Sequence, residues 1–132
     1  MKDLIGEDDF VFPFEKIEVW QLSVDLADYV YGLLESFPPN RHFRIIGQME
    51  AAVSGISQNI AEGKGRQYNK EFIQFLYIAI GCLFEALTLT EIFKRRKFFF
   101  SFERISFYGI FWNVFYNVQI SIIPFFNISL VF

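Results

Sequence analysis

The 132-residue chain has few of the side chains that most often carry chemistry: one cysteine, Cys82, and one histidine, His42. A single cysteine excludes an intrachain disulfide, and Cys82 lies in an apolar run where a buried thiol acts as a small hydrophobic group. A structural zinc ion needs four ligands, and a catalytic cysteine needs a base beside it, but His42 lies in another segment. We therefore expect no metal, no cofactor and no catalytic residue.

A recognisable signal peptide is also missing, because the first ten residues, MKDLIGEDDF, are acidic and contain no long apolar stretch. We expect a reducing, cytoplasmic location. The length predicts a single domain over residues 1–132. Within it we expect a helical-bundle core over residues 14–97 and an atypical C-terminal segment over residues 98–132.

Charge is unevenly distributed along the chain. The net charge of -3 gives no overall case for nucleic-acid binding. Residues 1–63 carry most of the acidic side chains, whereas residues 64–97 are basic. The basic residues near 64 and near 95 would lie at opposite ends of one helix, roughly 40 Å apart at about 1.5 Å per residue. They predict two separate basic spots.

Apolar residues recur every three or four positions in three segments, which is the spacing of one helix face. We predict helices over residues 17–36, 43–62 and 69–97, and Pro38 and Pro39 end the first. The predicted inward faces are Ile17, Trp20, Val24, Ala27, Tyr31 and Leu34, widened by Val19, Leu22, Leu26, Val30 and Leu33; then Ile45, Met49, Ala52, Val53, Ile56 and Ile60; then Phe72, Phe75, Leu76, Ala79, Leu83, Leu87 and Thr90.

The turn between the second and third helices is short, so we expect these helices to be antiparallel neighbours. Gly63 and Gly65 are predicted to supply the left-handed conformation that ends a helix, and Asn69 is predicted to cap the next one. Small residues on the second helix would let its neighbour approach closely: Ala51, Ala52, Ser54, Gly55 and Ser57.

The last part of the chain is unusual, because no charged residue occurs from Ile105 to Phe132. A fourth bundle helix would turn Ile110, Val114, Val118 and Ser121 inward. A transmembrane helix matches the apolar length of about 20 residues, and the β-branched and aromatic content favours strands. A reading frame shifted after about Glu91 would leave a tail never selected to pack. Pro124 would break any helix that reached it.

Several motifs make the chain resemble a family of four-helix-bundle proteins, many of them encoded in intervening sequences of bacterial 23S rRNA genes. The resemblance covers about Phe14 to Glu91. It is carried by FEKIEVWQ at residues 14–21, Phe37-Pro38, Gln48, AAVS at 51–54, NIAEG-x-GR at 59–66, KEF-x-x-FL at 70–76, Ala79 and Gly81. It implies an all-α, antiparallel up-down-up-down bundle that forms homopentamers. A related accessory protein of diversity-generating retroelements contacts nucleic acid and a reverse transcriptase.

The polar residues around the short turn allow two interpretations. In the first, Lys64, Arg66 and Lys70 bind phosphate oxygens beside the positive end of the third helix, and Arg95 and Arg96 form a second nucleic-acid contact. In the second, Asn59 and Glu62 brace the turn together with Gly63 and Gly65, and Arg66 pairs with a carboxylate.

The function expected from these observations is that of a non-enzymatic, oligomeric helical bundle that binds RNA or an enzyme acting on nucleic acid. The alternative is a structural or protein-interaction bundle with no nucleic-acid role. We expect no small-molecule substrate and no membrane partner.

Overall fold

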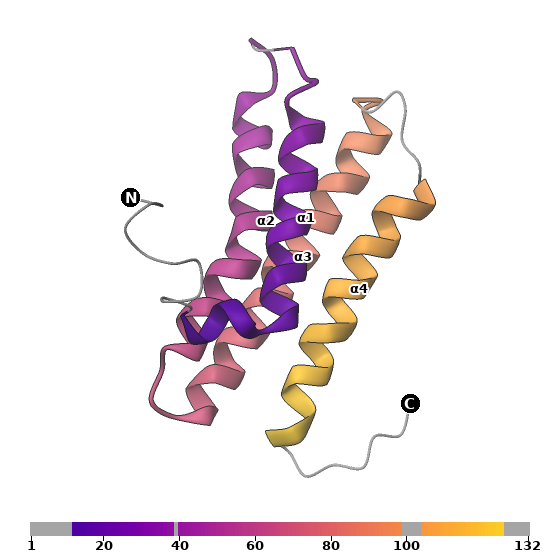
Figure 1. Ribbon diagram of the computed structural model, residues 1–132. Helices are drawn as coiled ribbons and strands as arrows, with labels where there is room; N and C mark the ends of the chain where they lie inside the picture. The colour runs from indigo at the N-terminus through magenta and orange to yellow at the C-terminus, as the bar shows by residue number, and fades with distance from the viewer. Residues whose placement is uncertain (1–11, 39, 99–103, 126–132) are drawn as a thin grey trace, which may run out of the picture.

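A computed structural model describes residues 12–38, 40–98 and 104–125 of the chain (Figure 1). This part is all-α, as predicted, and contains no strand. Two short 3-10 helices flank four α-helices: η1 Pro13–Lys16, α1 Glu18–Leu34, α2 Phe43–Lys64, α3 Asn69–Arg95, α4 Arg104–Ile122 and η2 Ile123–Phe125. The first three helices lie within two residues of their predicted limits.

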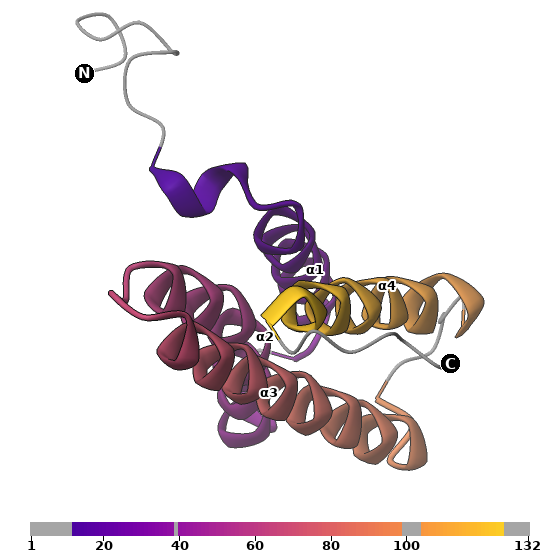
Figure 2. The ribbon, with the colours of Figure 1, turned by 90° about the horizontal axis from the view of Figure 1, so that it is seen from below.

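Contacts between side chains show how the helices are paired. Gly63 of α2 packs on Phe75 of α3, and Gly55 packs on Cys82. The residue number falls along α2 while it rises along α3, so the two helices are antiparallel. Aromatic contacts show that α3 also runs antiparallel to the segment that contains α4 and η2. Phe84 of α3 contacts Phe115, whereas Phe72, earlier in α3, contacts Phe125, which is later in the chain. Helix α4 packs against both α1 and α3, as Figure 2 shows from below.

The core is made of apolar side chains that all four helices turn inward. On α2 and α3 the predicted faces are largely confirmed, with Met49, Ala52, Val53, Ile56, Ile60, Leu76, Ala79, Leu83 and Thr90 buried. The predicted centre of the α1 face is partly wrong, because Val24 and Tyr31 are exposed. Helix α1 instead buries Val19, Ser23, Leu26, Ala27, Val30 and Leu34, since its neighbours α2 and α4 lie over that part of its wide apolar stripe.

The glycines before the α2–α3 turn have a different role from the predicted one. No described glycine has a positive φ, and Gly65 is right-handed at φ -76°. A Cβ on Gly63 would lie 2.5 Å from Cβ of Phe75, and one on Gly55 would lie 2.9 Å from Sγ of Cys82. The glycines that matter are therefore those that let α3 approach α2, as expected from the small residues of α2.

The start of α3 also corrects a prediction. Tyr68, with extended φ and ψ of -113° and 141°, is the N-cap, and Asn69 is already the first helical residue. The backbone N–H of Tyr68 donates to a carboxylate oxygen of Glu71 at 3.4 Å. Asn69 was a reasonable N-cap candidate by residue type. In the structure, however, the side chain of Glu71 accepts from the backbone N–H of Tyr68, which would otherwise be free at this helix end.

The charge-free segment forms a fourth helix and not strands in its described part. Helix α4 buries Phe107, Phe111, Val114, Val118 and Ile122. The inward placement of Val114 and Val118 is confirmed, whereas Ile110 and Ser121 are only half-buried. Pro124 lies in η2, immediately after α4. The predicted C-terminal segment also includes residues 99–103 and 126–132, which lie outside the described residues.

Candidate nucleic-acid interface and apolar face

The first candidate surface is the turn edge, made of Lys64, Arg66 and Lys70, which are all exposed. Arg66 Nη2 pairs with Glu62 Oε1 at 2.8 Å, and its guanidinium lies 4.9 Å from the ring centre of Phe75. Lys64 Nζ lies 5.7 Å from the ring centre of Phe72. Arg66 is therefore paired with a carboxylate, as the second interpretation predicted. The charge of Glu62 offsets part of the positive charge of the turn edge.

Asn59 does not brace the turn, contrary to the structural interpretation. Its Nδ2 donates to the carbonyl oxygen of Gly55 at 2.6 Å and lies 3.8 Å from Sγ of Cys82. Burial, with a smaller contribution from the charge of Glu85, raises the pKa of the Cys82 thiol. A protonated, half-buried thiol packed between α2 and α3 is a structural group and a poor nucleophile.

The opposite end of the bundle is organised by an aromatic cluster. Phe37, which follows α1, packs edge-on against Phe93 of α3 at 5.5 Å between ring centres and against Phe98 at 6.1 Å. The ring of His42, the N-cap of α2, lies 4.2 Å from that of Phe98. These contacts hold the α1–α2 connection against the end of α3.

The end of α3 is a Schellman motif. The N–H of Phe98 donates to Phe93 O at 3.0 Å, and the N–H of Lys97 donates to Lys94 O at 3.1 Å. Lys97 adopts φ 57°, the left-handed conformation that this motif requires. The ring contact of Phe93 with Phe98, at 5.8 Å, is the apolar contact that usually accompanies it. The motif fixes the direction in which the chain leaves α3.

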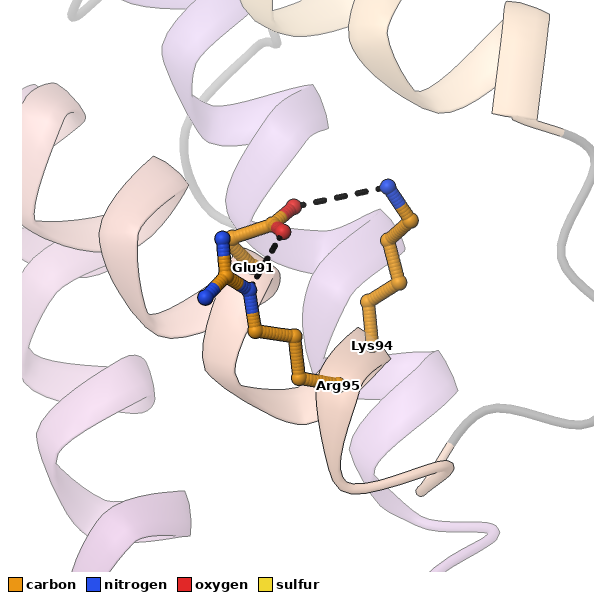
Figure 3. A network of polar contacts seen from close by, with 3 residues as sticks. All are labelled: Glu91, Lys94 and Arg95. Carbon is orange, nitrogen blue, oxygen red and sulfur yellow. Dashed lines mark hydrogen bonds and ion pairs between the residues drawn. The ribbon is translucent and has the colours of Figure 1, made fainter.

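Exposed cations flank the members of this aromatic cluster along the chain. We call this group the basic end, and it consists of Arg41, Arg44, Lys94, Arg95, Arg96 and Lys97, all exposed. Glu91 accepts from Arg95 Nε at 2.9 Å and from Lys94 Nζ at 3.5 Å (Figure 3). The hydrogen bond from Arg95, helped by the charge of Lys94, lowers the pKa of Glu91. Counted against the six cations, Glu91 and Glu35, which follows α1, leave an excess of positive charge on the described part of this end.

Sequence reasoning identified Arg95 and Arg96 but missed Arg41 and Arg44. The two missed arginines lie more than 50 residues before the others. The signal that could have found them is the antiparallel pairing of the second and third helices, which places the start of α2 beside the end of α3. Helix α3 separates the basic end from the turn edge, so the two predicted basic spots do not merge.

A second surface of the described bundle is apolar. We call it the α3–α4 face, and it consists of Phe84, Trp112, Tyr116 and Ile120, all exposed. The last three are spaced by four residues and so form one stripe along α4. Phe84 and Trp112 border a groove of about 460 Å³ between the helices, with Leu83, Leu87, Phe111 and Phe115. Its lining contains no charged side chain.

Helix α3 is also long and apolar enough to cross a membrane, judged only by its length and composition. Only 28% of its most apolar segment is buried within the bundle. The core helix of a soluble protein meets the same criterion, so this is weak evidence for a membrane span. It does show that much of the apolar surface of α3 has no cover within the described chain.

The geometry offers no assembled catalytic constellation among the described residues. Histidine, cysteine, aspartate and glutamate do not gather there in groups of three that could hold a metal ion. What the described bundle presents is a basic end and an apolar face. By its architecture the protein is an all-α helical-bundle protein, with its distinguishing chemistry on its outer surface.

The family model described as 23S rRNA-intervening sequence protein matches residues 15–108. The match covers well over half of the chain, and the protein belongs to this family. It includes α1, α2, α3 and the first turn of α4, and it continues past Glu91, where the alternative of a shifted frame was placed. No curated protein matches the chain.

Proposed function

We propose that the protein is a binding protein without enzymatic activity, which holds RNA at its basic end and self-associates through its α3–α4 face. The observation that carries the RNA part is the presence of six described cations at one end of the bundle, where the described carboxylates of Glu35 and Glu91 offset only part of their charge. Lys and Arg side chains bind the phosphates of a nucleic acid largely independently of its base sequence. Membership of a family named for 23S rRNA intervening sequences supports RNA as the polyanion.

The turn edge is the weaker of the two candidate RNA surfaces. It has three cations against six, and one of the three is paired with Glu62 at 2.8 Å. The positive end of the α3 dipole adds at most a modest attraction for phosphate. We therefore assign the principal RNA contact to the basic end and keep the turn edge as its comparison surface.

The test is fluorescence anisotropy with a structured RNA at about 50 and 200 mM salt, because the salt dependence counts the neutralised phosphates. One triple variant replaces Arg41, Arg44 and Arg96 by alanine. Its matched control replaces Lys64, Arg66 and Lys70 by alanine, so that each variant loses three cations. We expect the first to reduce the slope of log K against log salt by about 2 and the second by less than about 1.

Two results would contradict this assignment. A larger effect of Lys64, Arg66, Lys70→Ala would move the RNA contact to the turn edge. No RNA binding by the unsubstituted protein at the lower salt concentration would favour the alternative, a structural or protein-interaction bundle without a nucleic-acid role.

A further inference from the structure

Phe43 is the most exposed large apolar side chain among the described residues, with 73% of its surface accessible. It is the first residue of α2 and lies between two residues of the basic end, since Arg41 precedes it by two positions and Arg44 follows it. Phe43 is not among the half-buried hydrophobic residues that pack against the core. Its ring therefore contributes little to folding.

The backbone beneath Phe43 is firmly held. His42 adopts φ 61° as the N-cap of α2, and its ring lies 4.2 Å from that of Phe98. Phe98 is in turn fixed by the Schellman motif at the end of α3. The ring of Phe43 is thus presented to solvent from a defined position.

A single exposed apolar residue is ordinary on a protein surface. The surroundings distinguish Phe43 from the other exposed rings. Phe84 and Trp112 border a groove whose lining has no charge. Tyr68 is 63% exposed beside the turn edge, where Arg66 is already paired. Among the exposed rings that the structure describes, Phe43 alone lies within the group of cations at the basic end.

We propose that Phe43 is a stacking platform for an unpaired RNA base, with Arg41 and Arg44 binding the adjacent phosphates. An aromatic ring set among cations is the arrangement by which proteins hold single-stranded nucleic acid, because every base has a face that can stack. Bases inside a duplex are already stacked and present no face to the ring. The basic end accordingly prefers unpaired segments, such as a hairpin loop, over duplex RNA. This inference rests on the proposed RNA function.

The experiment compares a hairpin carrying 2-aminopurine in its loop with a blunt duplex of equal phosphate number. Binding to each is measured for the unsubstituted full chain and for Phe43→Ala, Phe43→Trp and the control Tyr68→Ala. We expect Phe43→Ala to weaken hairpin binding by about 5- to 150-fold, the range of one stacking contact, and to change duplex binding less than about twofold. Phe43→Trp retains hairpin binding and the quenching of 2-aminopurine, and Tyr68→Ala changes neither affinity.

The salt slope separates stacking from charge, because Phe43→Ala removes no cation and leaves the slope unchanged. Equal binding of the hairpin and the duplex by the unsubstituted protein, or equal losses for both RNAs in Phe43→Ala, would overturn the stacking role while RNA binding itself stood. A change in assembly mass in Phe43→Ala would assign the ring to a contact between copies instead. Absence of any RNA binding would overturn both proposals.

Discussion

The closest packing of α2 and α3 depends on single residues without side chains. Gly63 lies under Phe75 and Phe72, and a Cβ there would be 2.5 Å and 3.0 Å from their nearest atoms. The first atom is a Cβ, which cannot move unless α3 moves. At Gly81, by contrast, an added Cβ would meet nothing within 4 Å.

Gly63→Ala should therefore destabilise the bundle by about 1–3 kcal/mol, the usual cost of overpacking. Gly81→Ala is the matched control, and we expect it to stabilise α3 by about 0.5–1 kcal/mol because alanine is the better helix former. Urea unfolding followed by circular dichroism measures both. Equal effects of the two substitutions would show that α2 and α3 are not in such close contact at Gly63.

The backbone conformation of Lys97 affects the stability of the bundle more than its side chain does. A left-handed conformation at φ 57° is unfavourable for lysine and favourable for glycine. Lys97→Gly should raise the free energy of unfolding by about 1 kcal/mol, although it removes a cation from the basic end. The control is Arg96→Gly, because Arg96 is right-handed at φ -82° and gains nothing from glycine. A lower stability of Lys97→Gly would contradict the Schellman geometry.

At the scale of whole elements, α4 differs most from its neighbours. It has no charged side chain after Arg104, and both of its faces are apolar. Packing nevertheless distinguishes the two faces, because Phe111 is 1% exposed and Trp112 is 66% exposed. The inner face completes the bundle, and the outer face remains available.

Substitutions at these neighbouring positions test whether α4 is a true bundle helix. Phe111→Ala should cost about 3–5 kcal/mol, the usual range for a buried aromatic residue. Trp112→Ala should cost less than about 1 kcal/mol, because little of its surface is buried in the single chain. Thermal unfolding at a concentration where the chain is monomeric separates the two. Similar small losses would show that α4 does not pack in the described position.

At the scale of the whole molecule, the basic end and the α3–α4 face favour different kinds of interaction. The proposed RNA contact at the basic end is electrostatic and is expected to weaken with salt, whereas the proposed burial of the α3–α4 face between chains is driven by the hydrophobic effect and is expected to be nearly independent of salt. The charge-free outer face of α4 suits an apolar surface on a second copy of the chain better than a nucleic acid.

Sedimentation velocity tests the self-association. We expect an assembly several times the 15.6 kDa chain mass, which persists in high salt. Trp112→Glu and Phe84→Glu should shift it toward the monomer, because each buries an unpaired charge in an apolar interface. Tyr68→Glu is the control, since Tyr68 is exposed outside this face. A monomer in the unsubstituted protein would contradict the oligomeric part of the proposal.

The first three helices and most of the core that they share could be predicted from the sequence, whereas the fourth helix was one of four alternatives. The stripe from Met49 to Ile60 and that from Leu76 to Thr90 were readable because helical period and burial coincide on helices with one dominant apolar face. The buried side of the first helix was predicted less accurately, because its apolar stripe is wide enough to have two centres. Only the positions of α2 and α4 decided that Leu26 and Val30 are buried while Val24 and Tyr31 are exposed.

The tertiary structure alone decided where the surface chemistry gathers. Arg41 and Arg44 are distant from Lys94–Lys97 in sequence, and only the antiparallel pairing of α2 with α3 places them at one end of the molecule. The role of Gly63 likewise depends on Phe75, a residue of another helix. The outer face of α4 could not be told from its inner face by sequence, because both are apolar and only packing distinguishes them. Local periodicity fixes elements, whereas a surface is defined by residues that folding brings together.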